Sequence, residues 1–593
     1  MGGHQDQAYP LGCCFRSLWL HLCLVVLDFS QLVVSFSTVR FLPGYPGPGP
    51  FELETGYVGV DESEDVQLFY YFVKSEMNPK EDPTLLWLTG GPGCSSLSGL
   101  AYEIGPINFE IMKYNGSLPT LVLNPNSWTK LVVSFSTVRF LPGYPGPLPF
   151  ELETGYVGVD ESEDVQLFYY FVKSEMNPKE DPILLWLTGG PGCSVLSGLA
   201  YEIGPINFEI VEYNGSLPTL APNSNSWTKV SNIIFVDLPV ETGFSYTTSL
   251  RGSQTGDIKS SQHAYQFLRK WLTNHPEFLS NPVYIAGDSY SGITVPIIVQ
   301  HIANANEAGI KPLINLKGYL LGNPITDQSS EGNSKIPYAH GMALISDELY
   351  EHNERNLTEM CFLQSAKRNC GGEYVTIDPK NAVCLEDVQA FDKCISGINS
   401  AHILEPKCPL VAPKPKEMVG NRRSLGRNFR EFLDPQPPLP SFGCRTYAYL
   451  LSYYWVNDES VRKALNIRKG TVEDWQRCNN GLSYRYEIQS SFAFHVNLSK
   501  RGYRSLIYSG DHDMKVPFLA TQAWIRSLNY SIVDDWRPWL VNVQIAGYTR
   551  SYSNHMTFAT VKAREFGGGH TAPEYKPKEC FAMFKRWISE EPL

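Results

Sequence analysis

The 593-residue sequence lacks several features that would place it in a common class of protein. No stretch reaches about eighteen consecutive apolar residues, so we expect no membrane anchor. The formal net charge is −12 and no long basic run occurs, which argues against nucleic acid as a partner. The thirteen cysteines include no Cys-x-x-Cys pair, which disfavours zinc and redox motifs, and we expect neither a metal nor a cofactor. With 43% hydrophobic residues, the chain has enough apolar material for one large core.

Residues 283–292 carry the first positive signal. The run Val-Tyr-Ile-Ala-Gly-Asp-Ser-Tyr-Ser-Gly predicts a short strand, a tight turn at Ser289 and a helix that ends near Ala308. Such a nucleophile elbow exposes the serine hydroxyl and aims the N–H of the next residue, Tyr290, at a developing oxyanion. Taken alone the motif is weak, because serine between small residues is common in loops.

Two later strand patterns supply partners for a reactive serine, which needs a base and a group that orients the base. The strand at 506–508 leads to Asp511 and Asp513, and the strand at 556–561 leads through three glycines to His570. The order Ser289, aspartate, His570 is that of the α/β-hydrolase fold. Either carboxylate could face the imidazole.

An earlier strand contributes a candidate oxyanion loop. Residues 184–187 read Leu-Leu-Trp-Leu, and Thr-Gly-Gly-Pro-Gly-Cys follows at 188–193. The glycines leave backbone N–H groups able to point at a substrate oxygen. A simple structural turn is a poor explanation for this loop, because the serine, aspartate and histidine motifs follow it in the order of a hydrolase.

The motifs together closely resemble those of plant serine carboxypeptidase-like proteins, from about Ser136 to the C-terminus. They also include Asp-Leu-Pro-Val-Glu-Thr-Gly-Phe-Ser-Tyr at 237–246, Gly-Asp-His-Asp-Met-Lys-Val-Pro at 510–517 and Gly-Gly-Gly-His-Thr-Ala-Pro-Glu-Tyr at 567–575. The resemblance implies an α/β-hydrolase fold, with a central, mostly parallel sheet, helices on both faces and a disulfide-rich helical lid.

The resemblance also implies roles for individual residues. Ser289 is the expected nucleophile, His570 the general base and Asp513 its orienter, because the family uses the second aspartate of Gly-Asp-x-Asp. The N–H groups of Gly190 and Tyr290 are the expected oxyanion hole.

Two chemistries share this triad within the family, and three positions distinguish them. Carboxypeptidases hold a peptide's terminal carboxylate with an Asn before Gly-Gly, a Glu in Tyr-Glu-x-Gly-Pro and a Glu before the nucleophile. Here Glu202 is retained, but Thr188 precedes Gly189 and Asp288 precedes Ser289. The two changes resemble the acyltransferase branch, which takes acyl groups from glucose esters.

These four residues, Thr188, Gly189, Glu202 and Asp288, are the candidates for substrate binding. The expected partners are a small-molecule acyl donor and acceptor. The alternatives are a carboxypeptidase that acts on peptides and a catalytically inactive secreted protein.

The N-terminal region predicts entry into the secretory pathway. Arg16 precedes an apolar stretch at 18–27 that is too short to span a bilayer, as expected of a signal peptide within residues 1–31. By resemblance, the destination is vacuolar or extracellular. Glycosylation sequons occur at Asn115, Asn214, Asn356, Asn497 and Asn529.

The cysteines outside this region favour disulfides in an oxidising compartment. The family resemblance implies the pairs Cys193 with Cys478, Cys370 with Cys384, and Cys408 with Cys444. Most of the clustered cysteines fall at about 327–450, an interval expected to form the lid over the active site.

The chain also contains a tandem duplication. Residues 32–130 recur as 131–229, with differences at only a few positions such as Gly49/Leu148, Thr84/Ile183 and Ser96/Val195. A hydrolase sheet has room for one set of these strands, and the second copy runs directly into the next expected strand. We therefore expect residues 131–593 to form the catalytic domain and residues 32–130 to be a redundant copy.

Two further departures from the family pattern bear on activity. Ala563 to Phe566 are inserted just before the glycines that lead to His570, and Glu241 occupies a position that is usually glycine. Because catalysis tolerates little displacement of the base, the insertion could affect the position of His570.

Overall fold

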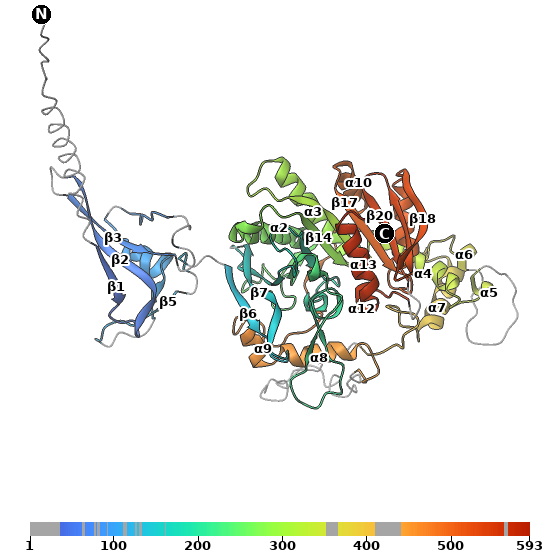
Figure 1. Ribbon diagram of the computed structural model, residues 1–593, viewed down its shortest axis with the longest axis horizontal. Helices are drawn as coiled ribbons and strands as arrows, with labels where there is room; N and C mark the ends of the chain where they lie inside the picture. The colour runs from blue at the N-terminus through green and yellow to red at the C-terminus, as the bar shows by residue number, and fades with distance from the viewer. Residues whose placement is uncertain are drawn as a thin grey trace, which may run out of the picture. The chain divides into compact units, whose positions relative to one another are not determined.

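The computed structural model describes residues 36–61, 66–75, 79, 84–91, 93–110, 116–124, 127–129, 133–160, 162–350, 366–409, 440–562 and 567–593. The expected signal segment, the sequons at Asn115 and Asn356 and the insertion at Ala563 to Phe566 lie outside these residues. The chain divides into two compact units, residues 1–132 and 133–593 (Figure 1).

An eleven-stranded sheet runs through unit 2 in the order β18-β19-β20-β17-β15-β14-β9-β12-β8-β7-β6. The six strands from β20 to β12 pair in parallel, and antiparallel strands extend both edges. In chain order these strands are β6 (Val133–Phe140), β7 (Pro147–Asp160), β8 (Val165–Val172), β9 (Ile183–Leu187), β12 (Asn232–Val236), β14 (Val283–Asp288), β15 (Leu316–Gly322), β17 (Arg504–Gly510), β18 (Ile532–Val541), β19 (Gln544–Tyr552) and β20 (Met556–Val561). The predicted α/β-hydrolase sheet is confirmed.

Helices cover both faces of this sheet, which is why its central strands are mostly buried and rich in apolar residues. All eight residues of β8 are buried. Tyr169 faces a layer that includes Phe267 of α2, whereas Phe168 belongs to the opposite core together with Phe584 of α13. The helices are α2 (Asp257–Asn274), α3 (Ser291–Glu307), α4 (Gln328–Gly341), α5 (Asp347–Tyr350), α6 (Ala366–Asn369), α7 (Ala382–Ile395), α8 (Tyr447–Val456), α9 (Glu459–Ala464), α10 (Phe492–Lys500), α11 (Phe518–Ser527), α12 (Ala572–Tyr575) and α13 (Pro577–Ile588). Among the described residues, no helix has the length and apolar character needed to cross a membrane.

The described part of the interval 327–450 is helical, as expected of the insertion. Helices α4 to α7 share a separate hydrophobic cluster that includes Ile336, Tyr338 and Phe391. Disulfides join Cys370 to Cys384 and Cys408 to Cys444.

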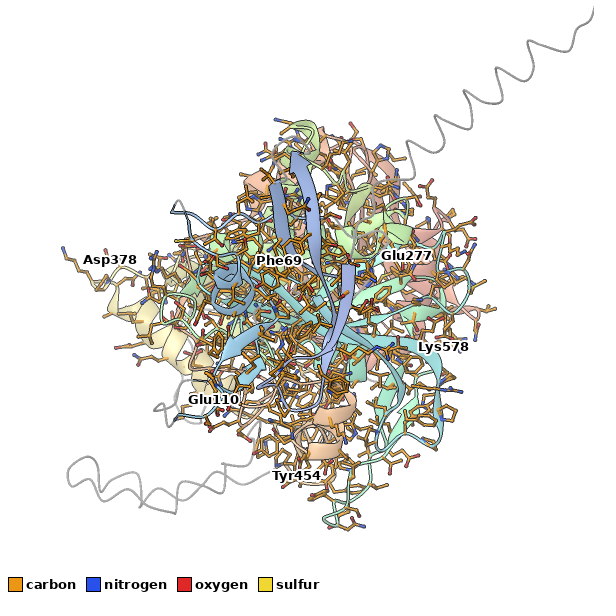
Figure 2. All side chains as sticks on the ribbon, turned by 90° about the vertical axis from the view of Figure 1, so that its left-hand side faces the viewer. Phe69, Glu110, Glu277, Asp378, Tyr454 and Lys578 are labelled. Carbon is orange, nitrogen blue, oxygen red and sulfur yellow. A yellow bond between two sulfur atoms is a disulfide. The ribbon has the colours of Figure 1, made fainter. Side chains whose placement is uncertain are left out.

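Unit 1 contains the first copy of the duplicated segment. Its three-stranded sheet consists of β1 (Phe36–Phe41), β2 (Pro48–Asp61) and β3 (Val66–Val73). The second copy forms β6, β7 and β8 at one edge of the large sheet in unit 2. Phe69, labelled in Figure 2, lies on β3 and is 47% exposed.

Short elements complete both units. Each copy has a π-helical turn followed by a two-stranded ribbon, and the second copy ends in a 3-10 turn. They are η1 (Gly99–Glu103), β4 (Ile107–Phe109) and β5 (Leu121–Leu123) in unit 1, and η2 (Gly198–Glu202), β10 (Ile206–Phe208), β11 (Leu220–Pro222), η3 (Trp227–Lys229), β13 (Thr255–Gly256), η4 (Pro276–Phe278) and β16 (Tyr484–Arg485) in unit 2.

Candidate active site

Three predicted site residues meet at the carboxyl ends of neighbouring parallel strands, the edge at which open α/β sheets bind ligands. Ser289 follows β14, Asp513 lies three residues after β17, and His570 comes after β20. His570 Nε2 lies 2.8 Å from Ser289 Oγ, and His570 Nδ1 lies 2.8 Å from Asp513 Oδ2. A hydroxyl, an imidazole and a buried carboxylate in this chain of hydrogen bonds can perform nucleophilic acyl transfer.

Ser289 has the backbone conformation of a nucleophile elbow. Its φ angle is +53°, a left-handed backbone conformation that residues other than glycine rarely adopt. The Ser289 N–H donates to the Gly322 carbonyl, and the Ser289 carbonyl accepts from the Ile325 N–H, both at 2.9 Å. These bonds to the end of β15 and to the loop after it hold the strained turn, and α3 begins at Ser291 as predicted for the elbow's helix.

Asp513 is fully buried and receives several donors. Its Oδ1 accepts from the N–H groups of Lys515 and Val516, at 2.7 and 3.2 Å. Its Oδ2 accepts from Asn323 Nδ2 at 2.8 Å in addition to the histidine. Four donors favour the ionised carboxylate, which stabilises an imidazolium on His570.

Asn323 was not predicted from the sequence. It directly follows β15, and its Oδ1 also accepts from the Gly510 N–H at 3.2 Å. The side chain therefore links the loops after β15 and β17 and orients the aspartate. A polar residue directly after an apolar parallel strand was the available signal.

Asp511, the alternative carboxylate, serves the histidine loop in another way. Its Oδ1 accepts from the Gly568 N–H at 3.0 Å and lies 2.7 Å from His512 Nδ1. Lys562 Nζ lies 3.5 Å from its Oδ2. Asp511 thus holds the glycine loop that precedes His570, while Asp513 contacts the imidazole itself.

The candidate oxyanion loop packs directly against the elbow. A Cβ on Gly189 would lie 2.7 Å from Ser289 Cβ and 2.8 Å from the Tyr290 nitrogen, so only glycine fits. Gly190 has φ +129°, again suited to glycine. No acceptor for the N–H of Gly190 or Tyr290 is found among the described residues. The disulfide between Cys193 and Cys478 anchors the far end of the loop.

Comparison with known proteins identifies the family. The family model described as "Serine carboxypeptidase" matches residues 43–133 and 142–590. The chain belongs to the serine carboxypeptidase family. It is 52% identical to serine carboxypeptidase-like 17 of Arabidopsis thaliana over 464 residues, 78% of this chain and 95% of that protein. Serine carboxypeptidase-like 19 of the same plant is also 52% identical, over 469 residues, with 78% and 96% coverage.

A solved serine carboxypeptidase has the same fold. The crystal structure of Kex1, a prohormone-processing carboxypeptidase from Saccharomyces cerevisiae, superposes with a TM-score of 0.57 at 19% identity. The superposition covers 74% of this chain and 92% of the yeast chain.

Two buried carboxyl groups, those of Asp288 and Glu202, lie beside the triad. Asp288 Oδ1 accepts from the Gly189 N–H at 2.9 Å, whereas neither carboxyl oxygen of Glu202 has a hydrogen-bond partner among the described residues. Burial and the neighbouring Asp288 raise the pKa of Glu202 well above its usual value. Burial also raises the pKa of Asp288, against the opposing effects of the Gly189 N–H and His570. The pair therefore holds at least one proton in mildly acidic solution.

Two other polar side chains accompany this pair. The Thr188 hydroxyl is buried without a partner among the described residues. Arg477, which the sequence did not suggest, lies with its guanidinium 3.8 Å from the centre of the Tyr449 ring. Burial opposes its charge, but Tyr449 and Glu574 raise the pKa of Arg477. A permanent cation therefore stands close to the carboxyl pair.

Glu241 adopts the backbone conformation that explains why glycine is usual there. Its φ angle is +67°. The Glu241 N–H donates to the Ser245 carbonyl at 3.0 Å, and its carbonyl accepts from Asn479 Nδ2 at 2.9 Å. The turn thus forms with glutamate, at a strain cost of about 1 kcal/mol.

A large cavity lies beside the segment that follows His570, and none of the three triad side chains lines it. Its volume is about 820 Å³, and Tyr201, Tyr449, Arg445 and Glu574 line part of its wall. Ala401, also in this wall, accepts the His570 N–H at 2.8 Å. The cavity has the size of a small-molecule site.

The remaining predicted site residues are the sequons. The described ones, Asn214, Asn497 and Asn529, are all exposed. Their side chains can therefore be reached from solvent.

Proposed function

We propose that this serine carboxypeptidase-like protein is an acyltransferase that moves an acyl group from a glucose ester to an acceptor hydroxyl or amine. The arrangement of Ser289, His570 and Asp513 supports an acyl-enzyme route.

In the first half-reaction His570 Nε2 accepts the Ser289 proton while Oγ attacks the ester carbonyl. The N–H groups of Gly190 and Tyr290 stabilise the resulting oxyanion. When the intermediate collapses, the C–O bond to glucose breaks, and the imidazolium returns its proton to the departing glucose oxygen. The acyl group is then an ester of Ser289.

In the second half-reaction the acceptor hydroxyl takes the place that glucose left. His570 accepts its proton, and the oxygen attacks the acyl-enzyme carbonyl through a second tetrahedral intermediate. The Ser289–acyl bond breaks, and Ser289 regains the proton from His570. Asp513 remains ionised throughout and stabilises the imidazolium.

The observation that carries the proposal is the contact of Asp288. Its carboxyl is engaged by the Gly189 N–H at 2.9 Å, on the oxyanion loop. With threonine at 188 in place of an amide side chain and aspartate at 288 in place of glutamate, Glu202 is the one retained member of the set with which carboxypeptidases hold a peptide's terminal carboxylate. This set favours a donor without such a carboxylate.

The decisive experiment offers both substrate classes to the full chain. Acyl-glucose esters with an acceptor alcohol should give the transferred ester, and blocked dipeptides should be hydrolysed poorly. Ser289→Ala should abolish transfer, a loss of about 10⁴-fold or more. Efficient release of C-terminal residues from peptides would instead establish a carboxypeptidase. Absence of Ser289 labelling by a fluorophosphonate probe would establish an inactive protein.

We further propose that residues 131–593 form the catalytic domain and that residues 32–130 are redundant to it. The large sheet already contains one set of the duplicated strands. A chain that lacks residues 32–130 should keep its activity, and loss of activity on that deletion would refute this assignment.

A secretory destination, vacuolar or extracellular, is also part of the proposal. The disulfides and the exposed sequons at Asn214, Asn497 and Asn529 support it. Protein from a plant secretory extract should lose mass on treatment with an N-glycosidase, and an unchanged mass would count against glycosylation.

A further inference from the structure

A buried aspartate outside the triad is joined to the nucleophile elbow. Asp257 is the first residue of α2 and is fully buried. Its Oδ1 accepts from the Tyr290 hydroxyl at 2.7 Å and from the Tyr484 hydroxyl at 2.8 Å. Its Oδ2 accepts from the N–H groups of Glu487 and Ile488, at 2.7 and 2.9 Å. All four partners can donate, and the helix N-terminus adds a favourable dipole, so the site suits a carboxylate.

The first of these contacts reaches the site of chemistry. Tyr290 directly follows Ser289 and supplies one proposed oxyanion donor through its backbone N–H. Its ring is nearly buried, and its hydroxyl is held by Asp257 from a different helix. Burial raises the pKa of Tyr290, and the Asp257 carboxylate adds to the effect, so the hydroxyl stays protonated as a donor.

The elbow needs such external support. Ser289 has φ +53°, and strained conformations persist only where surrounding contacts determine them. The backbone bonds to Gly322 and Ile325 hold the serine itself. The tyrosine side chain is tied instead to α2 and to the segment that begins at β16.

That segment is itself fixed to the start of α2. Thr255 and Gly256 of β13 pair with Tyr484 and Arg485 of β16. Glu487 Oε2 accepts from the Ile258 N–H at 3.1 Å. The Asp257 carboxylate therefore joins three rigidly connected pieces: the start of α2, the β16 segment and the elbow.

We propose that Asp257 is a positioning residue that aims the Tyr290 N–H at the oxyanion by holding the Tyr290 hydroxyl. The inference rests on the proposed acyl-transfer function. Loss of a whole oxyanion donor typically lowers kcat 10²–10³-fold. Without the Asp257 contact the Tyr290 N–H is still present and the backbone bonds of Ser289 remain, so we expect kcat to fall only about 10-fold.

The test uses the full chain with p-nitrophenyl acetate as the ester. Tyr290→Phe removes one hydroxyl and leaves Asp257 in place. Asp257→Asn keeps the shape of the side chain but replaces one of its two hydrogen-bond acceptors by an NH2 donor. The matched control is Tyr484→Phe, which removes the other hydroxyl on Oδ1 but keeps the ring that packs edge-on against Tyr290. Thermal denaturation records whether each variant folds.

We expect Tyr290→Phe and Asp257→Asn each to lower kcat about 10-fold with little change in KM, by the same factor at every pH. The double variant should be no slower than the slower single variant, because both remove one interaction. Tyr484→Phe should lower kcat less than threefold.

Three results would overturn the inference. An unchanged kcat in Tyr290→Phe is sufficient even if Asp257→Asn does not fold. Additive losses in the double variant would show that Asp257 acts through its other partners. An equal effect of Tyr484→Phe would indicate general loosening. Fluorophosphonate labelling of wild-type Ser289 separates the two proposals: an unlabelled wild type overturns both, whereas a labelled wild type with an unchanged Tyr290→Phe overturns only this one.

Discussion

The two copies of the duplicated segment share all but eight of 99 positions and fold alike locally. β1 pairs with β2 in the register in which β6 pairs with β7, with Phe36 opposite Gly56 and Phe135 opposite Gly155. Internal bonds also recur. The hydroxyl of Tyr70 donates to Glu54 at 2.8 Å, and that of the equivalent Tyr169 donates to Glu153 at 2.7 Å.

Burial separates the two copies. Leu68 is 57% exposed and its counterpart Leu167 is fully buried. Trp128 is 61% exposed, whereas Trp227 is fully buried and stacks on Phe584 of α13, with ring centres 4.1 Å apart. Leu167 and Trp227 thus belong to the large cores of unit 2, whereas the first copy forms a small separate cluster that includes Leu53, Leu100 and Ile107.

The difference in burial shows which parts of the segment fold through contacts with residues nearby in sequence and which need partners from elsewhere in the chain. Antiparallel hairpins form in both copies, because their hydrogen-bond partners lie nearby in sequence. Residues 183–187 form β9 between β12 and β14, but residues 84–89 of the first copy form no strand, since no such neighbours pair with them. Cys94 is an exposed free thiol, while its counterpart Cys193 is bonded to Cys478.

The largest contrast should come from a core tryptophan. Trp186 is fully buried, and its counterpart Trp87 is 37% exposed. We expect Trp186→Ala to lower the free energy of unfolding by about 3–5 kcal/mol, because it leaves a cavity. Trp87→Ala should change that of unit 2 by less than about 0.5 kcal/mol. Urea denaturation of the two variants measures both, and equal losses would contradict the assignment of the second copy to the core.

Gly189 and its counterpart Gly90 extend the comparison of the two copies to catalytic activity. A Cβ on Gly189 would collide with the elbow, whereas nothing lies within 4 Å of a Cβ on Gly90. We expect Gly189→Ala to lower kcat with p-nitrophenyl acetate about 100-fold, since the oxyanion loop must move. Gly90→Ala should leave kcat unchanged. A loss of activity in Gly90→Ala would mean that the first copy supplies the oxyanion loop.

The sequence predicted this fold and the triad because both are encoded in short, ordered motifs. Strand, turn and glycine patterns indicated Ser289, His570 and an aspartate at 511 or 513, and chain order selected the α/β-hydrolase fold. The choice between Asp511 and Asp513 depended on the family resemblance, because both follow the same strand.

Three contributors were not found this way. Asn323, Asp257 and Arg477 act through contacts between segments far apart in the chain, and of the three only Asn323 has a local signal, its place directly after an apolar strand. The sequence of the first copy also does not reveal that it is exposed, since the two copies have nearly the same sequence. Tertiary contacts determine the exposure of the first copy and the roles of these three residues, and such contacts are seen only in the structure.

The eight differing positions allow a smaller test. Ile183 is fully buried, whereas Thr84 is exposed. Ile183→Thr should lower the free energy of unfolding by about 2 kcal/mol, because it buries a hydroxyl in an apolar core. The reciprocal Thr84→Ile should have almost no effect. Urea denaturation measures both, and a substantial effect of Thr84→Ile would show that residue 84 packs in a core.

The smallest contrast concerns pH and the glutamates of η1 and η2. Glu202 is buried, and its pKa is raised by burial and by Asp288; its counterpart Glu103 is exposed. A raised pKa means that the folded state binds the proton more tightly than the unfolded chain, so stability falls as pH rises from the unfolded value of about 4.3 toward the folded one. Glu202→Gln should remove this loss, so that the free energy of unfolding falls less between pH 4.5 and pH 7 than it does in the wild type. Glu103→Gln, at the exposed counterpart, is the matched control variant. Denaturant midpoints for the three proteins across this range measure the effect. If Glu202→Gln kept the wild-type slope, the loss of stability would have to arise at another carboxyl, with Asp288 the first to substitute.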